Sequence, residues 1–146
     1  MSFRTWHDYG YGFRVDDIET TPEKVRSLLC LAPTIYNSFL NWAEKNYSGM
    51  EEGLENYYEY DLHSVIGGLA DIISMVIQER EGLSLCICEN YDGEEYVLYQ
   101  PSYPWELKPV EHILKQADVE DIFRKYLKYI TDKKVEITYQ EVENGG

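Results

Sequence analysis

The chain has 146 residues, a net charge of −14 and an apolar fraction of 44%, which predicts one folded acidic domain and excludes a disordered segment. Cys30, Cys86 and Cys88 are the cysteines, and an odd number with a C-x-C spacing excludes a disulfide framework and favours a reducing, cytoplasmic compartment. No apolar run reaches the length of a membrane span and no leader pattern opens the chain, so we expect neither a transmembrane helix nor a secretory signal.

The acidic residues are concentrated in the middle of the sequence. Residues 46–107 carry 13 acids and a single base, Arg80, whereas residues 1–45 carry 6 acids and 5 bases and residues 108–146 carry 8 acids and 7 bases. Such a field repels nucleic acid and anionic membranes and attracts a basic protein surface. The sequence therefore predicts a protein partner with a basic surface, and direct contact with neither nucleic acid nor a membrane. The alternative is an acidic surface that serves only solubility.

The first predicted element is a strand over residues 3–14, where aromatic residues alternate with polar residues and glycines. The odd positions present aromatic side chains to a core. Gly10 and Gly12 fall on the opposite face, where their missing side chains leave room for a bulge or a closely approaching segment. His7 and Asp8 are neighbours along the strand, so their side chains point to opposite faces and do not form a catalytic pair.

Helices are predicted over residues 20–31 and 34–47, with a threonine cap before Pro22 in the first and Pro33 at the start of the second. Residues 48–61 are acidic and rich in tyrosine, which predicts a loop or a short, poorly anchored helix. The most apolar helix is predicted over 62–80, with the pair Gly67-Gly68 inside it at a cost of about 1 kcal/mol per glycine.

The second half of the chain predicts a β-hairpin, a helix and a last strand. The hairpin covers residues 83–99 and turns at Asp92-Gly93, and an extended connection with three prolines follows over 101–109. The helix is expected to begin near Asp118, with Asp121 completing a capping-box analogue. The last strand covers 134–140 with Val135, Ile137 and Tyr139 pointing inward, and residues 143–146 form a frayed tail.

These elements predict a single α+β domain over residues 1–146. We expect a mainly antiparallel sheet of about four strands, built from the N-terminal strand, the central hairpin and the C-terminal strand. About four helices pack on this sheet.

The sequence carries no catalytic constellation. Gly10 and Gly12 lack the third glycine of a dinucleotide loop, and no phosphate loop or nucleophile motif occurs. Cys86 and Cys88 face the same side of their predicted strand, but no further zinc-ligand spacing accompanies them. We therefore expect buried, inert thiols, no metal, no cofactor and no enzymatic activity. A metal-dependent enzyme that uses Cys86, Cys88 and a histidine is the minor alternative.

Two segments combine carboxylates with tyrosines, and we predict that they bind the partner. Carboxylates supply steering and charge-assisted hydrogen bonds, and tyrosine supplies rigid contact area. For either segment alone, the alternative is a solvated acidic face. The predicted partner-binding residues are Glu51, Glu52, Glu55, Tyr57, Tyr58, Glu59, Tyr60 and Asp61 in the first segment, and Glu89, Tyr91, Asp92, Glu94 and Glu95 in the second.

Three stretches carry a resemblance to a known group of proteins. They are TWHDYGYGF followed by TTPEKV, then YDGEEYVLYQPSYPWEL, and finally ITYQEVENGG. In this order, and over nearly the full length, the chain resembles small acidic proteins encoded on mobile elements and prophages of Gram-positive gut bacteria. The resemblance transfers no active residue. It implies a genomic setting in which small acidic proteins are often inhibitors of host defence, including anti-CRISPR and anti-restriction proteins.

Charge and resemblance together predict a non-enzymatic anti-defence inhibitor in the host cytoplasm. It would bind a CRISPR nuclease or a restriction enzyme and block the basic nucleic-acid groove, with carboxylates in the place of phosphates. The alternative is an intracellular regulatory or adaptor domain unrelated to defence, which would be favoured by an exposed apolar or aromatic patch.

Overall fold

The computed structural model describes residues 5–57, 68–100 and 115–145. Within them the fold is α+β, as predicted, with one antiparallel four-stranded sheet and five α-helices, of which four have seven or more residues. The strand order is β2-β3-β1-β4. The strands are β1 (Thr5–Arg14), β2 (Cys86–Glu89), β3 (Glu95–Tyr99) and β4 (Thr138–Gly145), and the helices are α1 (Pro22–Leu29), α2 (Pro33–Asn46), α3 (Met50–Glu55), α4 (Leu69–Glu81) and α5 (Gln116–Leu127), with a 3-10 turn, η1 (Val15–Asp17).

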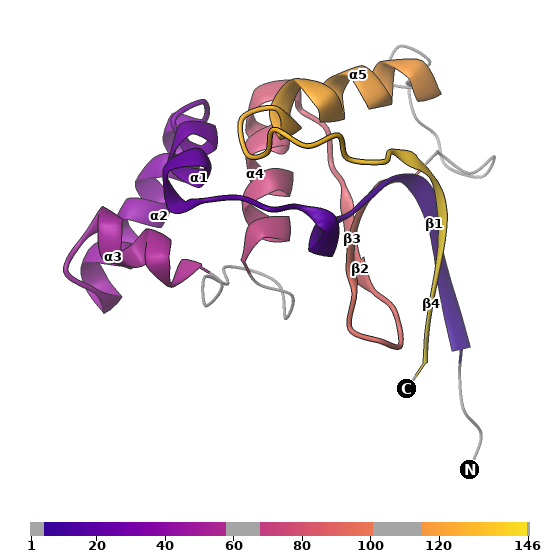
Figure 1. The fold of residues 1–146 in the computed structure, drawn as a ribbon, viewed down its shortest axis with the longest axis horizontal. Helices are drawn as coiled ribbons and strands as arrows, with labels where there is room; N and C mark the ends of the chain where they lie inside the picture. The colour runs from indigo at the N-terminus through magenta and orange to yellow at the C-terminus, as the bar shows by residue number, and fades with distance from the viewer. Residues whose placement is uncertain (1–4, 58–67, 101–114, 146) are drawn as a thin grey trace.

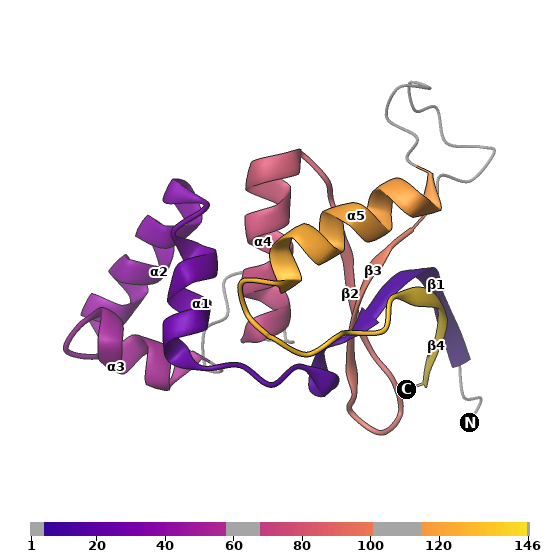
Figure 2. The same ribbon diagram turned by 45° about the horizontal axis from the view of Figure 1, so that its top comes forward.

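The helices are arranged in two groups around the sheet. Helices α4 and α5 lie against one face of the sheet, and α1, α2 and α3 form a group on the other side of α4 (Figures 1 and 2). No described helix has both the length and the apolarity that a bilayer crossing requires.

The main hydrophobic core lies between the sheet and the helices. Phe13 of β1 and Phe123 of α5 are fully buried, and their rings meet edge to face with centroids 5.2 Å apart. Val97 of β3 and the apolar face of α4, with Ile73 and Ile77, complete this contact. The alternation predicted for β1 therefore directs Phe13 into the core, as expected. Tyr9, farther along the same face, is 37% exposed, so the predicted core-facing aromatic face is wrong at this position.

The opposite face of the sheet holds a second, smaller core, because the sheet curls. Its buried residues are Cys88, Leu98 and Val142. The strands β2 and β4 stand at opposite edges of the sheet and nevertheless approach each other, and Figure 1 shows the bend of β1 and β4. At Gly10 and Gly12, β1 passes close to the backbone of β3. This confirms the close approach that the two glycines predict.

The N-terminal helices begin where the sequence indicates. The side chain of Thr21 accepts a hydrogen bond from the backbone N–H of Lys24 at 3.3 Å and caps α1, and Pro33 opens α2. Helix α3 is better anchored than expected. A side chain at its buried Gly53 would lie 2.4 Å from the Cβ of Ala43, so α2 and α3 are in close contact there.

Two helix starts differ from the prediction. Helix α4 begins after Gly68, which has a φ of 85° and is the N-cap residue, so this glycine precedes the helix instead of weakening it. Residues 62–67 of the predicted helix lie outside the described residues. Helix α5 begins at Gln116, and Lys115 is its N-cap. Asp118 is therefore inside the first turn, where a carboxylate faces the positive end of the helix dipole, and the predicted capping box is wrong.

The C-terminal strand lies later in the chain than predicted. It begins at Thr138, and its residues 143–145 pair with Thr5, Trp6 and His7 instead of fraying, because β1 extends far enough towards the N-terminus to pair with them. Val135 and Ile137 are buried as expected, but Tyr139 is 60% exposed. The predicted connection over 101–109, residue 146 and the side chain of His7 lie outside the described part of the chain.

Candidate functional site

The turn of the β2–β3 hairpin is held by backbone and side-chain hydrogen bonds. The backbone N–H of Asn90 donates to the carbonyl of Glu94 at 3.1 Å, and the Asn90 side-chain oxygen accepts from the backbone N–H groups of Asp92 at 3.0 Å and Glu94 at 2.9 Å. Gly93 has a φ of 80°, in the left-handed region. The predicted turn at Asp92-Gly93 is confirmed. It presents Tyr91, which is 59% exposed.

The 3-10 turn η1 brings two further carboxylates to this hairpin. Arg14 donates hydrogen bonds to Asp17 and to Glu94, and Asp16 accepts one from the backbone N–H of Glu95 at 3.1 Å. We call this surface the hairpin acidic patch. It consists of Asp16, Asp17, Glu89, Asp92, Glu94 and Glu95.

Glu95 lies close to several other carboxyl groups of this region. It lies directly opposite Glu89 in the β2–β3 pair, where like charges are unfavourable. Partial burial, followed by the charges of Asp16, Glu89 and Asp71, raises the pKa of Glu95 to about 7. Asp71 itself is on α4 and is only 4% exposed. Burial, reinforced by the neighbouring carboxylates, therefore holds Glu95 partly protonated near neutral pH.

Helix α3 presents the other predicted acidic segment. Glu51, Glu52 and Glu55 are exposed on this helix. Glu52 accepts hydrogen bonds from the hydroxyl and the backbone N–H of Ser48 at 2.5 and 2.9 Å, which lowers the pKa of its carboxyl. Glu51 and Glu55 line a groove of about 570 Å³ that the start of α1 closes on the other side, with Glu23 and Arg26.

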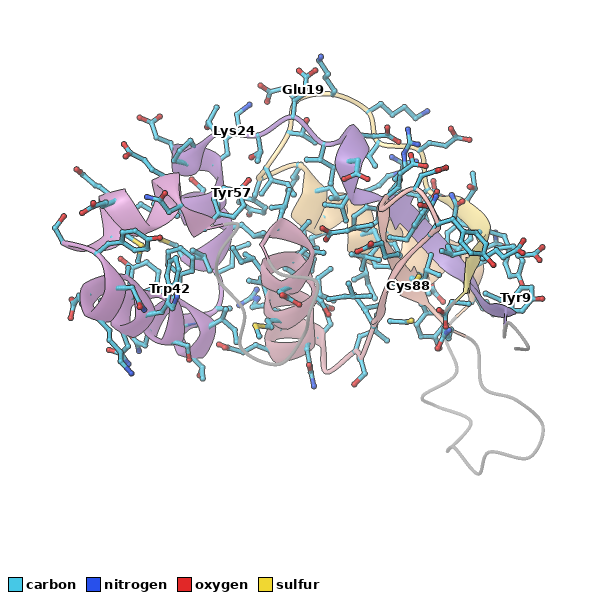
Figure 3. All side chains as sticks on the ribbon, turned by 90° about the horizontal axis from the view of Figure 1, so that it is seen from below. Tyr9, Glu19, Lys24, Trp42, Tyr57 and Cys88 are labelled. Carbon is cyan, nitrogen blue, oxygen red and sulfur yellow. The ribbon has the colours of Figure 1, made fainter. Side chains whose placement is uncertain are left out.

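Tyr57 is half-buried behind α3. It packs against the main core, and burial raises the pKa of its hydroxyl. Figure 3 shows this tyrosine between the α1–α3 group and α4. It therefore offers less contact area than the exposed Tyr91. The remaining predicted residues of this segment, Tyr58, Glu59, Tyr60 and Asp61, lie outside the described residues.

The two predicted acidic segments do not form one surface. In both views α3 and the hairpin turn lie far apart, with α4 between them (Figures 1 and 2). A partner that contacts one of them reaches the other only if it spans the molecule. The structure instead joins the hairpin to Asp16 and Asp17, which sequence reasoning missed because they belong to the nearly neutral segment 1–45. Their only sequence signal was their position directly after β1.

Four cations on and around α5 and α1 form ion pairs with acids. Arg124 pairs with Glu120 at 2.7 Å and Lys125 pairs with Glu81 at 3.2 Å. Two further pairs join the loop after α5 to the segment around α1, where Figure 3 labels Glu19 and Lys24. These pairs are Lys133–Glu19 at 2.6 Å and Lys24–Asp132 at 2.8 Å.

A third cluster joins a carboxylate to two thiols on the curled face of the sheet. The Sγ of Cys86 lies 3.9 Å from the Oδ1 of Asp8, and with the Sγ of Cys88 these atoms all lie within 4.8 Å of one another. The shared face predicted for the two cysteines is confirmed. A hydrogen bond from Cys88 lowers the pKa of Cys86, and the same bond together with burial raises the pKa of Cys88.

Comparison with protein-family models, with curated proteins and with solved structures finds no match to this chain.

Proposed function

We propose that this protein is a non-enzymatic anti-defence inhibitor whose hairpin acidic patch occupies the basic nucleic-acid groove of a CRISPR nuclease or a restriction enzyme. The observation that carries the proposal is the gathering of six carboxyl groups from η1 and the β2–β3 hairpin around one hydrogen-bonded turn that exposes Tyr91, with Arg14 as the base that pairs with two of them. The resemblance to small acidic proteins of mobile elements supports the same class of partner.

The chemistry of the patch suits a surface that normally holds phosphates. Carboxylates form charge-assisted hydrogen bonds with arginine and lysine, as phosphate oxygens do. The hydrogen bonds of Asn90 and Asp16 fix the backbone that carries them, which reduces the entropy lost on binding. Tyr91 adds an aromatic surface next to the acids, of the kind that is enriched in interface centres.

The exposed side chains favour this proposal over an apolar adaptor surface. The large hydrophobic side chains that the described residues expose are Tyr9, Tyr91 and Tyr139, each with a polar hydroxyl. The acidic face of α3 lies at the other end of the molecule, and its contribution is long-range attraction. This role fades with salt, because screening acts over about 10 Å at 0.1 M and about 3 Å at 1 M.

Two double charge reversals test which acidic surface makes contact. The first is Glu89→Lys with Asp92→Lys in the hairpin, and the second is Glu51→Lys with Glu55→Lys in α3. The four side chains make no ion pair with another described residue, and both variants change the net charge equally. The measurement is the dissociation constant for guide-loaded CRISPR nucleases and restriction enzymes, at low and at high salt and with competing DNA.

We expect the hairpin variant to bind at least about tenfold more weakly than the wild type, since close interfacial charge pairs contribute about 1.5–7 kcal/mol. The α3 variant should lose affinity only at low salt. Equal losses of affinity in the two variants would mean that only the net charge of the protein matters, which contradicts contact through the hairpin acidic patch. Unchanged affinity in both variants would refute any acidic contact. For a non-enzymatic blocker, we expect inhibition to saturate at one inhibitor per nuclease. Mass spectrometry should then show that the mass of the nuclease is unchanged.

A further inference from the structure

We propose that Asp8, Cys86 and Cys88 bind one thiophilic divalent cation of the Zn²⁺ class. This site is separate from the hairpin acidic patch, and it brings together two strands that are not neighbours in the sheet. Asp8 comes from β1, whereas both cysteines come from β2, and β3 lies between these strands. The curl of the sheet is what brings the carboxylate to the thiols.

The separations of the three side chains fit such an ion. With bonds of about 2.3 Å to sulfur and about 2.1 Å to oxygen, tetrahedral zinc places its ligand atoms about 3.6–3.8 Å apart. Here the oxygen of Asp8 and the sulfur of Cys86 are 3.9 Å apart, and every pair in the cluster is within 4.8 Å. Small rotations of the side chains therefore suffice to close the site, and the two strands stay in place.

The ligand types select the metal. Two thiolates favour zinc or copper(I), and a hard carboxylate oxygen shifts the preference towards Zn²⁺. The Nε2 of Gln100 lies 3.5 Å from the Oδ1 of Asp8, a position from which an outer amide orients the ligating carboxylate. A fourth coordination position is left for water or an external ligand, as in open zinc sites.

The surroundings of the cluster support metal binding over a disulfide. Cys88 is 6% exposed and packs with Leu98 and Val142, whereas Cys86 and Asp8 are half-buried and reachable by an ion. Alternate residues of an extended strand are about 6.6–6.8 Å apart at Cα, at the far limit of disulfide geometry, whose usual value is about 5.5–6 Å. A cation offsets the charge of the carboxylate and the two thiolates without bending β2.

The test is a titration of the metal-free, reduced 146-residue chain with Zn²⁺ and with Co²⁺. We expect one ion per chain, a thiolate-to-cobalt charge-transfer absorption, and a higher thermal midpoint with Zn²⁺ because the ion ties β1 to β2. Cys86→Ser and Asp8→Asn should each weaken Zn²⁺ binding by a factor on the order of 100. Cys30→Ser is the matched control, since Cys30 is exposed at the end of α1, and it should bind as the wild type does.

The outcomes separate a metal site from its alternatives. Absence of stoichiometric binding, a cobalt spectrum without thiolate absorption, or full binding in Cys86→Ser would overturn the proposal. The pair Cys86 and Cys88 would instead be assigned to a disulfide by two results together. These are the loss of two titratable thiols when no reductant is present, and no zinc uptake by the reduced chain. Circular dichroism of each metal-free variant establishes that it folds, and Asp8→Asn keeps the test decisive if a cysteine variant does not.

Discussion

Replacing Gly12 by alanine tests the curled sheet directly. The β-carbon of an alanine at this position would lie 1.9 Å from the carbonyl oxygen of Val97 and 3.0 Å from the Cα of Leu98. These are backbone atoms, so no rotamer change relieves the overlap. Strands β1 and β3 would have to separate by more than about 1 Å to reach ordinary contact distance, which disrupts the pairing of Gly12 with Leu98.

The expected loss of stability follows from that displacement. Overpacking a close contact costs about 1–3 kcal/mol, and each ladder hydrogen bond that is lost adds about 1 kcal/mol. Alanine recovers only about 0.4–1 kcal/mol by restricting the unfolded chain. We therefore expect Gly12→Ala to lower the free energy of unfolding by about 3 kcal/mol. This is a large part of the total of about 5–15 kcal/mol that is typical of a domain.

Urea denaturation followed by circular dichroism measures this loss, with two other glycines as graded controls. At Gly10 an added Cβ would lie 2.7 Å from the carbonyl oxygen of Tyr99, a smaller overlap. At Gly82 nothing lies within 4 Å, and the cost is the strain of its φ of 70°, about 1–2 kcal/mol. Gly12→Ala should be the most destabilising of the three. A midpoint for Gly12→Ala equal to or above that of Gly82→Ala would contradict the close approach of β1 to β3.

Three further predictions concern the pH dependence, a helix cap and the main core. Burial and neighbouring acids raise the pKa of Glu95 from its ordinary value of 4.5 to about 7 in the folded state. The folded state therefore binds this proton more tightly, and stability should rise as the pH falls from 8 to 5. Glu95→Gln should flatten that rise in urea midpoints measured across the range. Thr21→Ala should cost about 1 kcal/mol by removing the cap of α1, with a parallel loss of helical signal on heating. Phe123→Ala should lower the free energy of unfolding by about 3–5 kcal/mol. The control Tyr139→Ala, on the surface, should change it by no more than about 0.5 kcal/mol in the same urea denaturation assay. Similar losses of stability in the two variants would place Phe123 outside the core.

The sequence by itself determined the features that depend on near neighbours in the chain. The turn at Asp92-Gly93 follows from the positive φ that glycine tolerates. The cap of α1 follows from the hydroxyl of Thr21, which lies three residues before Lys24 and accepts a hydrogen bond from its backbone N–H. The common face of Cys86 and Cys88 follows from the two-residue period of a strand. These local rules were sufficient for the α+β class and for most element positions.

The tertiary structure alone decided which distant residues meet. Asp8 and Cys86 are 78 positions apart in the sequence, Arg14 and Glu94 are 80 apart, and Asp16 and Glu95 are 79 apart. Each of these contacts depends on β1 lying beside the β2–β3 hairpin, and strand order is not encoded in local propensity. The same pairing extends β4 to residue 145. The acidic patch and the thiol cluster are therefore properties of the sheet, because they exist only where β1 curls across the hairpin.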